Sequence, residues 1–248
     1  MKQKTLLIMT LISTLLGCGN KISGPDFEHQ ENKVIVLNDD FRIDYQIPGN
    51  LSLFMDFAEK HKKQSKSITL DKINNLEYEK HLWRNTHTLD TGMWEYYRGK
   101  RNVEANTAAN LSVSINIHKL QFDNTSIIQK FLHNAYESYL NGVNGTNTEV
   151  RKENPELSDE ELGQWIVQVP KFNTVNINRV DYTYWHTYGE VNGRNLKYFI
   201  TPINNEYYFE LRFRYSLSAK NEKEADAVET MITNDINEFM KQLHISKH

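Results

Sequence analysis

The chain has 248 residues, with 29 Lys and Arg against 32 Asp and Glu and a formal net charge of −3. A mildly acidic chain of this length does not suit a nucleic-acid-binding protein, and it accommodates one large domain or two small ones. Aromatic residues make up 11% of the sequence, which is too many for a disordered chain.

The N-terminus has the pattern of a secretory signal. Two lysines precede an apolar run from Thr5 to Leu16, and Cys18, the only cysteine, follows almost directly. The run is shorter than the ~20 residues that a membrane-spanning helix needs. Leu15-Leu16-Gly17-Cys18 resembles the lipobox of bacterial lipoproteins, in which the cysteine is acylated and becomes the first mature residue. The resemblance implies a signal peptide over residues 1–17 and a lipid on Cys18.

Several expectations follow from this lipoprotein-like signal. One cysteine leaves no intramolecular disulfide and no thiolate metal site. Gly19, where an aspartate would retain an enterobacterial lipoprotein at the inner membrane, implies the outer membrane with the domain facing the periplasm. Residues 18–32 are polar and contain Gly and Pro, so we predict a flexible lipidated tether with a span of roughly 20 Å. Residues 33–248 are then a single domain.

The first half of the domain has strand-like segments. Phe41–Ile47 alternates apolar and polar residues and stops at Pro48. Thr91-Gly92 predicts a turn in front of a strand over Met93–Arg98. Leu111–His118 alternates, with its odd positions apolar and its even positions polar. We therefore expect one buried face and one solvated face for that strand.

A helix is predicted next. Apolar residues from Ile127 to Leu140 recur at helical spacing, and Asn141-Gly142 is typical of a helix end. Residues 143–156 are rich in Asn, Gly, Thr and charge, which predicts an internal loop.

The last third has the most regular pattern. Strands are predicted over Thr174–Tyr188, Arg194–Pro202 and Glu206–Leu217, joined by short turns that force antiparallel pairing. A final helix begins near Asn221 and ends near Leu243. The fold class is therefore α+β, an antiparallel sheet flanked by amphipathic helices.

This order of elements, from Phe41–Ile47 to the last helix, resembles the PsbP-like α/β/α sandwich. Bacterial lipoproteins and secretion-associated proteins use that fold. The resemblance covers most of residues 33–243 and rests on the order and patterns of the elements, so it carries over no functional residue.

A search for catalytic motifs finds none. The sequence has no Gly-x-Ser-x-Gly elbow, no phosphate-binding Gly-rich loop and no His-Glu-x-x-His. None of its 9 histidines pairs at metal-ligand spacing. Glu77 and Glu79 would share one side of a strand, as in glycosidase carboxylate pairs, but such pairs are more typical of a solvated face. We predict no catalytic residue, no metal and no cofactor.

Aromatic side chains suggest a protein-binding surface instead. Alternation turns Trp185 and Tyr208 away from their aromatic neighbours, and Arg212 and Arg214 share the face of Tyr208. Trp, Tyr and Arg are enriched at binding hot spots, and Trp94 belongs to a second aromatic cluster. The alternative is that a second helix layer covers this face.

Three functions remain open at this point. The first is a non-catalytic, membrane-anchored lipoprotein that binds a protein partner, in its sharpest form an immunity protein that blocks a toxin delivered by a contact-dependent or type VI secretion system. The second is an envelope assembly or stress lipoprotein that binds resident membrane machinery. The third, which we favour least, is a hydrolase with a scattered site.

Overall fold

The computed structural model describes residues 21–38, 40–52, 65–70, 79–81, 84–99, 106–119, 128–158, 169–188, 194–204 and 206–247. These residues form an α+β fold, as the sequence predicts. In chain order its elements are β1 (Ile22–Ser23), β2 (Asp26–Leu37), β3 (Phe41–Gly49), β4 (Ser65–Ile68), β5 (Glu79–His81), β6 (Arg84–Arg98), β7 (Thr107–Lys119), α3 (Ile128–Glu153), β8 (Asn173–Ile177), β9 (Val180–Tyr188), β10 (Arg194–Pro202), β11 (Tyr207–Leu217), α4 (Glu222–Gln242) and β12 (His244–Lys247).

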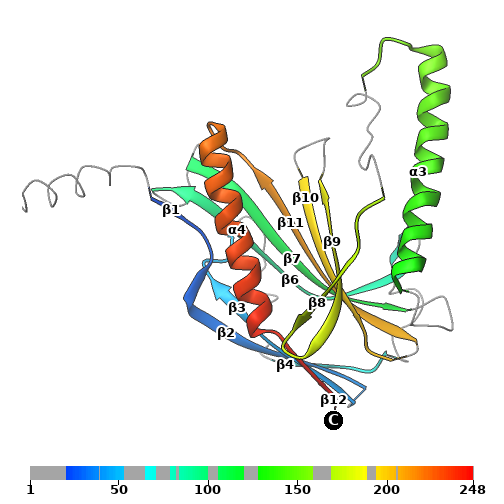
Figure 1. Ribbon diagram of the computed structural model, residues 1–248. Coiled ribbons are helices and arrows are strands. Elements are labelled where there is room, and N and C mark those ends of the chain that lie inside the picture. The colour runs from blue at the N-terminus through cyan, green and yellow to red at the C-terminus, as the bar shows by residue number, and fades with distance from the viewer. Residues whose placement is uncertain are drawn as a thin grey trace, which may run out of the picture.

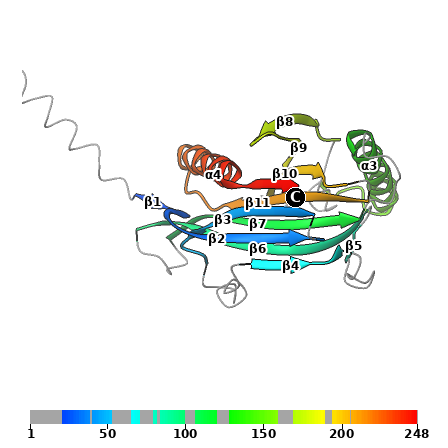
Figure 2. The same ribbon diagram turned by 90° about the horizontal axis from the view of Figure 1, so that it is seen from below.

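The strands form two sheets (Figure 1). The larger one has eight strands in the order β1-β6-β7-β11-β10-β9-β8, with β5 pairing β6 outside this path. The smaller one has four strands in the order β12-β3-β2-β4, and β2 and β4 are its parallel pair. The larger sheet curls, so that α4 lies inside the curve while α3 lies beyond β9 and β10 (Figure 2).

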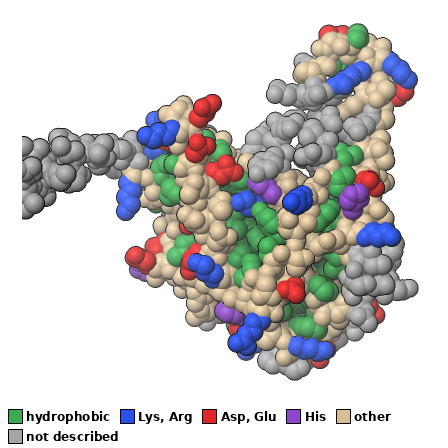
Figure 3. Space-filling model, viewed as in Figure 1, with side chains coloured by type: hydrophobic (Ala, Val, Ile, Leu, Met, Phe, Trp, Pro, Cys, Tyr) green, Lys and Arg blue, Asp and Glu red, His purple; other side chains and the backbone are tan. Residues whose placement is uncertain are grey.

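Alternation along the strands gives the larger sheet two different faces. The front face carries apolar residues such as Val113, Leu211 and Phe213, and it joins one core cluster with α4 and the smaller sheet. The residues that α4 buries lie at helical spacing: Val228, Ile232, Ile236, Phe239 and Met240. Apolar side chains between α4 and strands β9 and β10 remain visible at the surface (Figure 3).

The back face of the larger sheet packs against α3 at one end. Leu132 and Tyr136 of α3 form a second core cluster with Trp185 and Tyr198. The Trp185 and Tyr198 rings stack with centroids 4.5 Å apart, and Trp185 Nε1 donates a hydrogen bond to the Tyr136 hydroxyl at 2.9 Å. Burying two large aromatic rings fixes the first half of α3 on the sheet.

Several predicted elements agree with the structure. β10 covers Arg194–Pro202 as expected, and β11 begins one residue after its predicted start. Asn221 is the N-cap of α4, and its side chain accepts a hydrogen bond from the Glu224 main-chain N–H at 3.0 Å. A short polar side chain before an amphipathic stretch is therefore a reliable helix start here.

The predicted turn at Thr91-Gly92 is wrong, because β6 runs through both residues. A Cβ on Gly92 would lie 2.8 Å from Cη2 of Trp94. Gly92 therefore makes room for the indole two residues further along the strand, and it does not reverse the chain.

The predicted end of the long helix at Asn141-Gly142 is also wrong. α3 continues to Glu153, so most of the predicted loop over 143–156 is helical. Among the described glycines, Gly99 has a positive φ and Gly142 does not, so no left-handed cap forms there. The single strand predicted over Thr174–Tyr188 is also wrong, because this segment forms a hairpin of β8 and β9. Asn178 and Arg179, with φ values of 52° and 67°, form the turn between the two strands.

The predicted tether is much shorter than the sequence suggested. Residues 30–32 pair with β3, and β1 pairs with the end of β6. Ile22 and Phe27 also pack against the main core. Polar residues can thus pair as strands through their main chains, so polarity alone did not predict a coil.

Candidate functional site

The candidate site is the part of the back face that lies beyond α3. β6, β7 and β11 are neighbouring antiparallel strands, so their outward residues form rows across the sheet. We call three of these rows the back-face array. They are Thr91, Ser114 and Arg212; Met93, Ser112 and Arg214; and Glu95, Asn110 and Ser216.

All the array residues except Arg212 and Glu95 line a hollow of about 420 Å³. Arg214 is exposed, and the other array side chains are half-buried. The hydroxyl of Ser112 donates a hydrogen bond to the main-chain oxygen of Arg214 at 3.3 Å. Hydroxyl and amide groups with guanidinium groups among them suit a partner that presents carboxylates or other hydrogen-bond acceptors. The residues that line the hollow are Thr91, Gly92, Met93, Asn110, Leu111, Ser112, Ser114, Arg214, Tyr215 and Ser216.

The next rows along the back face form a buried polar network. The prediction that the even positions of Leu111–His118 face solvent is wrong at Asn116 and His118, which are both 0% exposed. Asn116 Nδ2 donates to Glu210 Oε1 at 3.0 Å. Tyr208 stacks on the His118 ring with centroids 4.6 Å apart, and Tyr208 itself packs in the cluster that α3 covers.

This network contains a hydroxyl, an imidazole and a carboxylate in line. Thr86 Oγ1 lies 2.8 Å from His118 Nδ1, and His118 Nε2 lies 3.3 Å from Glu210 Oε2. The same order of groups activates a nucleophile in hydrolases. Here His118 and Glu210 are fully buried, and neither residue lines the hollow of the array. The geometry thus supports a fixed hydrogen-bond network that holds β6, β7 and β11 in register.

The aromatic residues that the sequence singled out do not lie at the surface. Trp185 is 0% and Tyr208 is 2% exposed, because the helix layer that we kept as the alternative, α3, covers them. Trp94 is 1% exposed on the front face, and its Nε1 donates to the Pro48 main-chain oxygen at 3.1 Å. The alternative of a covering helix layer is therefore confirmed for Trp185 and Tyr208, and none of the three aromatic residues forms an exposed binding surface.

The two arginines stay in the site. Arg212 is half-buried and Arg214 is exposed, and both lie in the array as the alternation predicts. Cys18 lies outside the described residues, as does Glu77. Alternation placed Ser112 and Ser114 on the solvated face of β7, but nothing in the sequence indicates that they lie beside Arg212 and Arg214, because strand pairing between distant segments brings them together.

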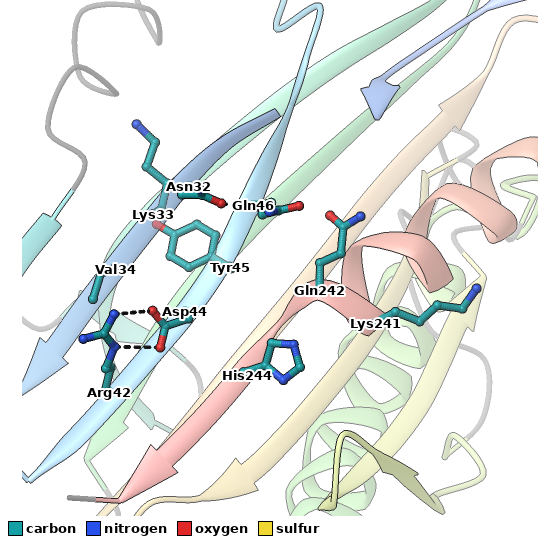
Figure 4. A pocket seen from close by; sticks show the side chains of 10 residues that line it. All are labelled: Asn32, Lys33, Val34, Arg42, Asp44, Tyr45, Gln46, Lys241, Gln242 and His244. Carbon is teal, nitrogen blue, oxygen red and sulfur yellow. Dashed lines mark hydrogen bonds and ion pairs between the residues drawn. The ribbon is translucent and has the colours of Figure 1, made fainter. Parts of the chain in front are cut away.

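A second hollow, of about 440 Å³, lies where α4 ends beside the smaller sheet (Figure 4). Arg42 donates to both carboxylate oxygens of Asp44 at 2.7 and 2.8 Å, and Lys241 pairs with Glu238 at 3.1 Å. These charges are paired with one another at the protein surface. The hollow therefore makes a weaker candidate for a charged ligand than the array does.

A further polar cluster lies on the front face under α4. Lys197 Nζ donates to Thr233 Oγ1 at 2.9 Å, and the Tyr215 hydroxyl donates to Glu229 Oε1 at 2.7 Å. Lys197 and His186 are cross-strand neighbours. Burial lowers the pKa of His186 to about 4, with the nearby ammonium acting in the same direction and Glu229 opposing it. The imidazole is therefore neutral at neutral pH.

The part of the chain that the structure describes has no cluster of His, Cys, Asp and Glu that would hold a metal ion. No helix among the described residues is both long and apolar enough to cross a bilayer. Comparison of the chain with protein-family models, curated proteins and solved structures finds no match.

Proposed function

We propose that this protein is a lipid-anchored envelope protein that captures a protein partner on the back-face array. The observation that carries the proposal is the array itself, a hollowed and accessible sheet face on which Arg212 and Arg214 stand among hydroxyl and amide groups. Arginine is enriched at binding hot spots, and a partner that presents carboxylates would complement this face.

The partner that we favour is a secreted antibacterial toxin, which would make the protein an immunity lipoprotein. The lipobox-like Leu15-Leu16-Gly17-Cys18 supports a lipid anchor, and Gly19 supports a position in the outer membrane, facing the periplasm, where such a toxin arrives. The alternative is an envelope assembly or stress lipoprotein with a PsbP-like sandwich. The packing of α4 and α3 on opposite faces of an antiparallel sheet supports that finer description of the fold.

The anchor is tested by fractionation. Wild-type protein is expected in the membrane pellet, and Cys18→Ser is expected in the soluble fraction with an unchanged circular dichroism spectrum. A Cys18→Ser protein that still pellets with membranes would contradict lipid anchoring.

The binding surface is tested by charge reversal. Each antibacterial effector encoded beside the gene is expressed in the periplasm with wild-type protein, with Arg212→Glu/Arg214→Glu, or with Arg151→Glu. Arg151 is a matched control, because it is an exposed arginine on α3 outside the array. Wild-type and Arg151→Glu are expected to protect against one effector, whereas the array variant binds it at least about tenfold more weakly and does not protect.

Equal killing by every neighbouring effector, with and without the protein, would contradict the immunity function. A pull-down that retrieves resident envelope machinery and no toxin would then favour the assembly or stress function. Loss of that machinery from the array variant, but not from Arg151→Glu, would keep the array as the binding surface.

The hydrolase hypothesis keeps one supporting observation, the in-line arrangement of Thr86, His118 and Glu210. If these groups were catalytic, Thr86→Val would remove activity against peptidoglycan and esters while leaving partner binding intact. We expect neither activity in the wild-type protein, since both ionisable groups are fully buried.

A further inference from the structure

We infer that one end of the domain lies directly against the bilayer, so that the back-face array works close to the membrane surface. This end consists of β1, the last residues of β6 and the first turn of α4. The inference rests on the proposed acylation of Cys18, and it adds the orientation of the domain and the distance at which a partner can dock.

The described part of the chain begins at Lys21, directly before β1. Ile22 pairs with Arg98 and Ser23 with Tyr97 at the end of β6. The Gly99 main-chain N–H also donates to the Lys21 oxygen at 3.5 Å. Figure 1 shows β1 at the end of the molecule where α4 begins, away from β12 and the C-terminal residue.

The link between the lipid and this end is therefore short. Cys18 is three residues before Lys21, and three extended residues reach only ~10–11 Å. The tether expected from the sequence would have spanned roughly 20 Å on average and more when stretched. A link shorter than the domain itself leaves little room for the opposite end to face the bilayer.

The strand position opposite Ile22 is held to α4 by Arg98, whose side chain is 5% exposed. Its Nε and Nη2 donate to the two carboxylate oxygens of Glu224 at 2.5 and 2.7 Å. Nη2 also donates to the Ser218 oxygen at 2.9 Å, and Nη1 donates to the Thr107 oxygen at 3.0 Å. Bidentate pairing and main-chain contacts together make β1, β6 and the start of α4 one rigid end.

The exposed charges at this end fit a lipid surface. Lys21, Lys220 and Lys223 are exposed, and Glu222 and Asp226 are the exposed acids nearby. Anionic headgroups attract lysines that lie within a Debye length of the surface, and a short anchor keeps them there. The acids make this attraction secondary to the covalent link.

The array lies a fixed distance from the same end. Glu95 is three residues and Thr91 seven residues before Arg98 on β6, which corresponds to ~10 and ~23 Å along the strand. With the link and the ~5 Å step from β1 to β6 added, the β6 residues of the array lie within about 40 Å of the anchored Cα. A partner that docks there must be at or in the membrane, or must arrive at its surface.

The experiment places a thiol probe at each end of the acylated protein, in which the Cys18 sulfur is already consumed. Lys223→Cys marks the proposed membrane end. Ser246→Cys is the matched control. Ser246 is exposed and pairs with Arg42 of β3. Arg42 lies at the opposite end of the β2–β3 hairpin from the Asp26–Gly49 pair. Both are labelled with a fluorophore and reconstituted in phosphatidylcholine–phosphatidylglycerol vesicles that carry headgroup nitroxides.

We expect the label at position 223 to be quenched at least about threefold more than the label at 246. Insertion of 20 Gly and Ser residues after Gly19 is expected to remove the difference while the protein still floats with the vesicles. Flotation with equal quenching at the two positions, or quenching unchanged by the insertion, would overturn the inference and leave the anchor intact. Failure of the acylated preparation to float would instead overturn the anchor on which the inference rests.

Discussion

The side-chain Nδ2 of Asn178 donates a hydrogen bond to the main-chain oxygen of Leu243 at 2.7 Å. The same nitrogen lies 2.8 and 3.3 Å from the oxygens of Lys241 and Met240. A hairpin turn between β8 and β9 thus caps the C-terminal end of α4, where helix carbonyls lack partners within the helix. The relationship joins two segments that lie more than sixty residues apart in the chain.

Loss of this cap is expected to destabilise the protein. Asn178 has φ = 52°, so Asn178→Gly keeps the backbone conformation and removes only the side chain. We expect a loss of about 1–2 kcal/mol in the free energy of unfolding, measured by urea denaturation. Arg179→Gly is the control in the same turn, since Arg179 has φ = 67° and is exposed. It should stabilise by roughly 0.5–1 kcal/mol, and equal losses in both variants would refute the cap.

The distal half of α3 is expected to gain stability from alanine. Gly142 and Gly145 lie inside the helix, and a Cβ on either would have no atom within 4 Å. Each Gly→Ala change should stabilise the helix by about 0.5–1 kcal/mol and slow amide exchange in residues 143–153. Gly92→Ala is the opposing control, because its Cβ would meet Trp94 and lower the melting temperature. Faster exchange in the helix variants would contradict the expectation.

The sequence correctly predicted those helix and strand ends that are set by residues close by in the chain. The strand Arg194–Pro202 and the cap at Asn221 are two examples, because alternation and capping act over a few residues. One error lies where a tertiary contact decides, because Gly92 makes room for the Trp94 ring. Asn141-Gly142 stays helical although its composition favours a helix end, and no contact at Gly142 explains it.

The candidate site was only half predictable for the same reason. Alternation placed Arg212 and Arg214 on one face of β11 from sequence alone. The row partners Ser112 and Ser114 come from β7, and only strand pairing with register brings them together. Trp185 looked exposed because the sequence does not show which face α3 covers.

Acid stability should depend on Glu224. The hydrogen bonds from Arg98, followed by that from the Lys220 main-chain N–H, lower the pKa of this carboxyl from 4.5 to about 2. A carboxyl with a lowered folded pKa stabilises the fold above pH 4.5, and this contribution is lost as the pH falls toward 2. Glu224→Gln should remove about 2–3 kcal/mol at pH 7 and flatten the stability curve between pH 4.5 and 2.

The control for that prediction is Glu222→Gln. Glu222 occupies the same first turn of α4 and is exposed, so it tests the helix-terminal charge without the buried pair. Guanidinium chloride denaturation at pH 2.5, 3.5, 5 and 7 compares the three proteins. The role of the Arg98–Glu224 pair would be refuted if the slopes of wild-type and Glu224→Gln agreed below pH 4.5.

His186 should destabilise the protein over a different and milder range of pH. Its folded pKa of about 4 lies below the ordinary 6.5, so the unfolded chain binds the proton more tightly between these values. The free energy of unfolding therefore has its full value above pH 6.5 and falls as the pH drops toward 4, by up to about 3 kcal/mol.

His186→Gln removes the titration and keeps a polar group near the Tyr215 hydroxyl, which lies 3.4 Å from His186 Nε2. Its unfolding free energy should change less than that of wild-type from pH 6.5 to 4, whereas His133→Gln, at an exposed site on α3, should follow wild-type. Parallel curves for wild-type and His186→Gln would show that the imidazole does not titrate differently on folding.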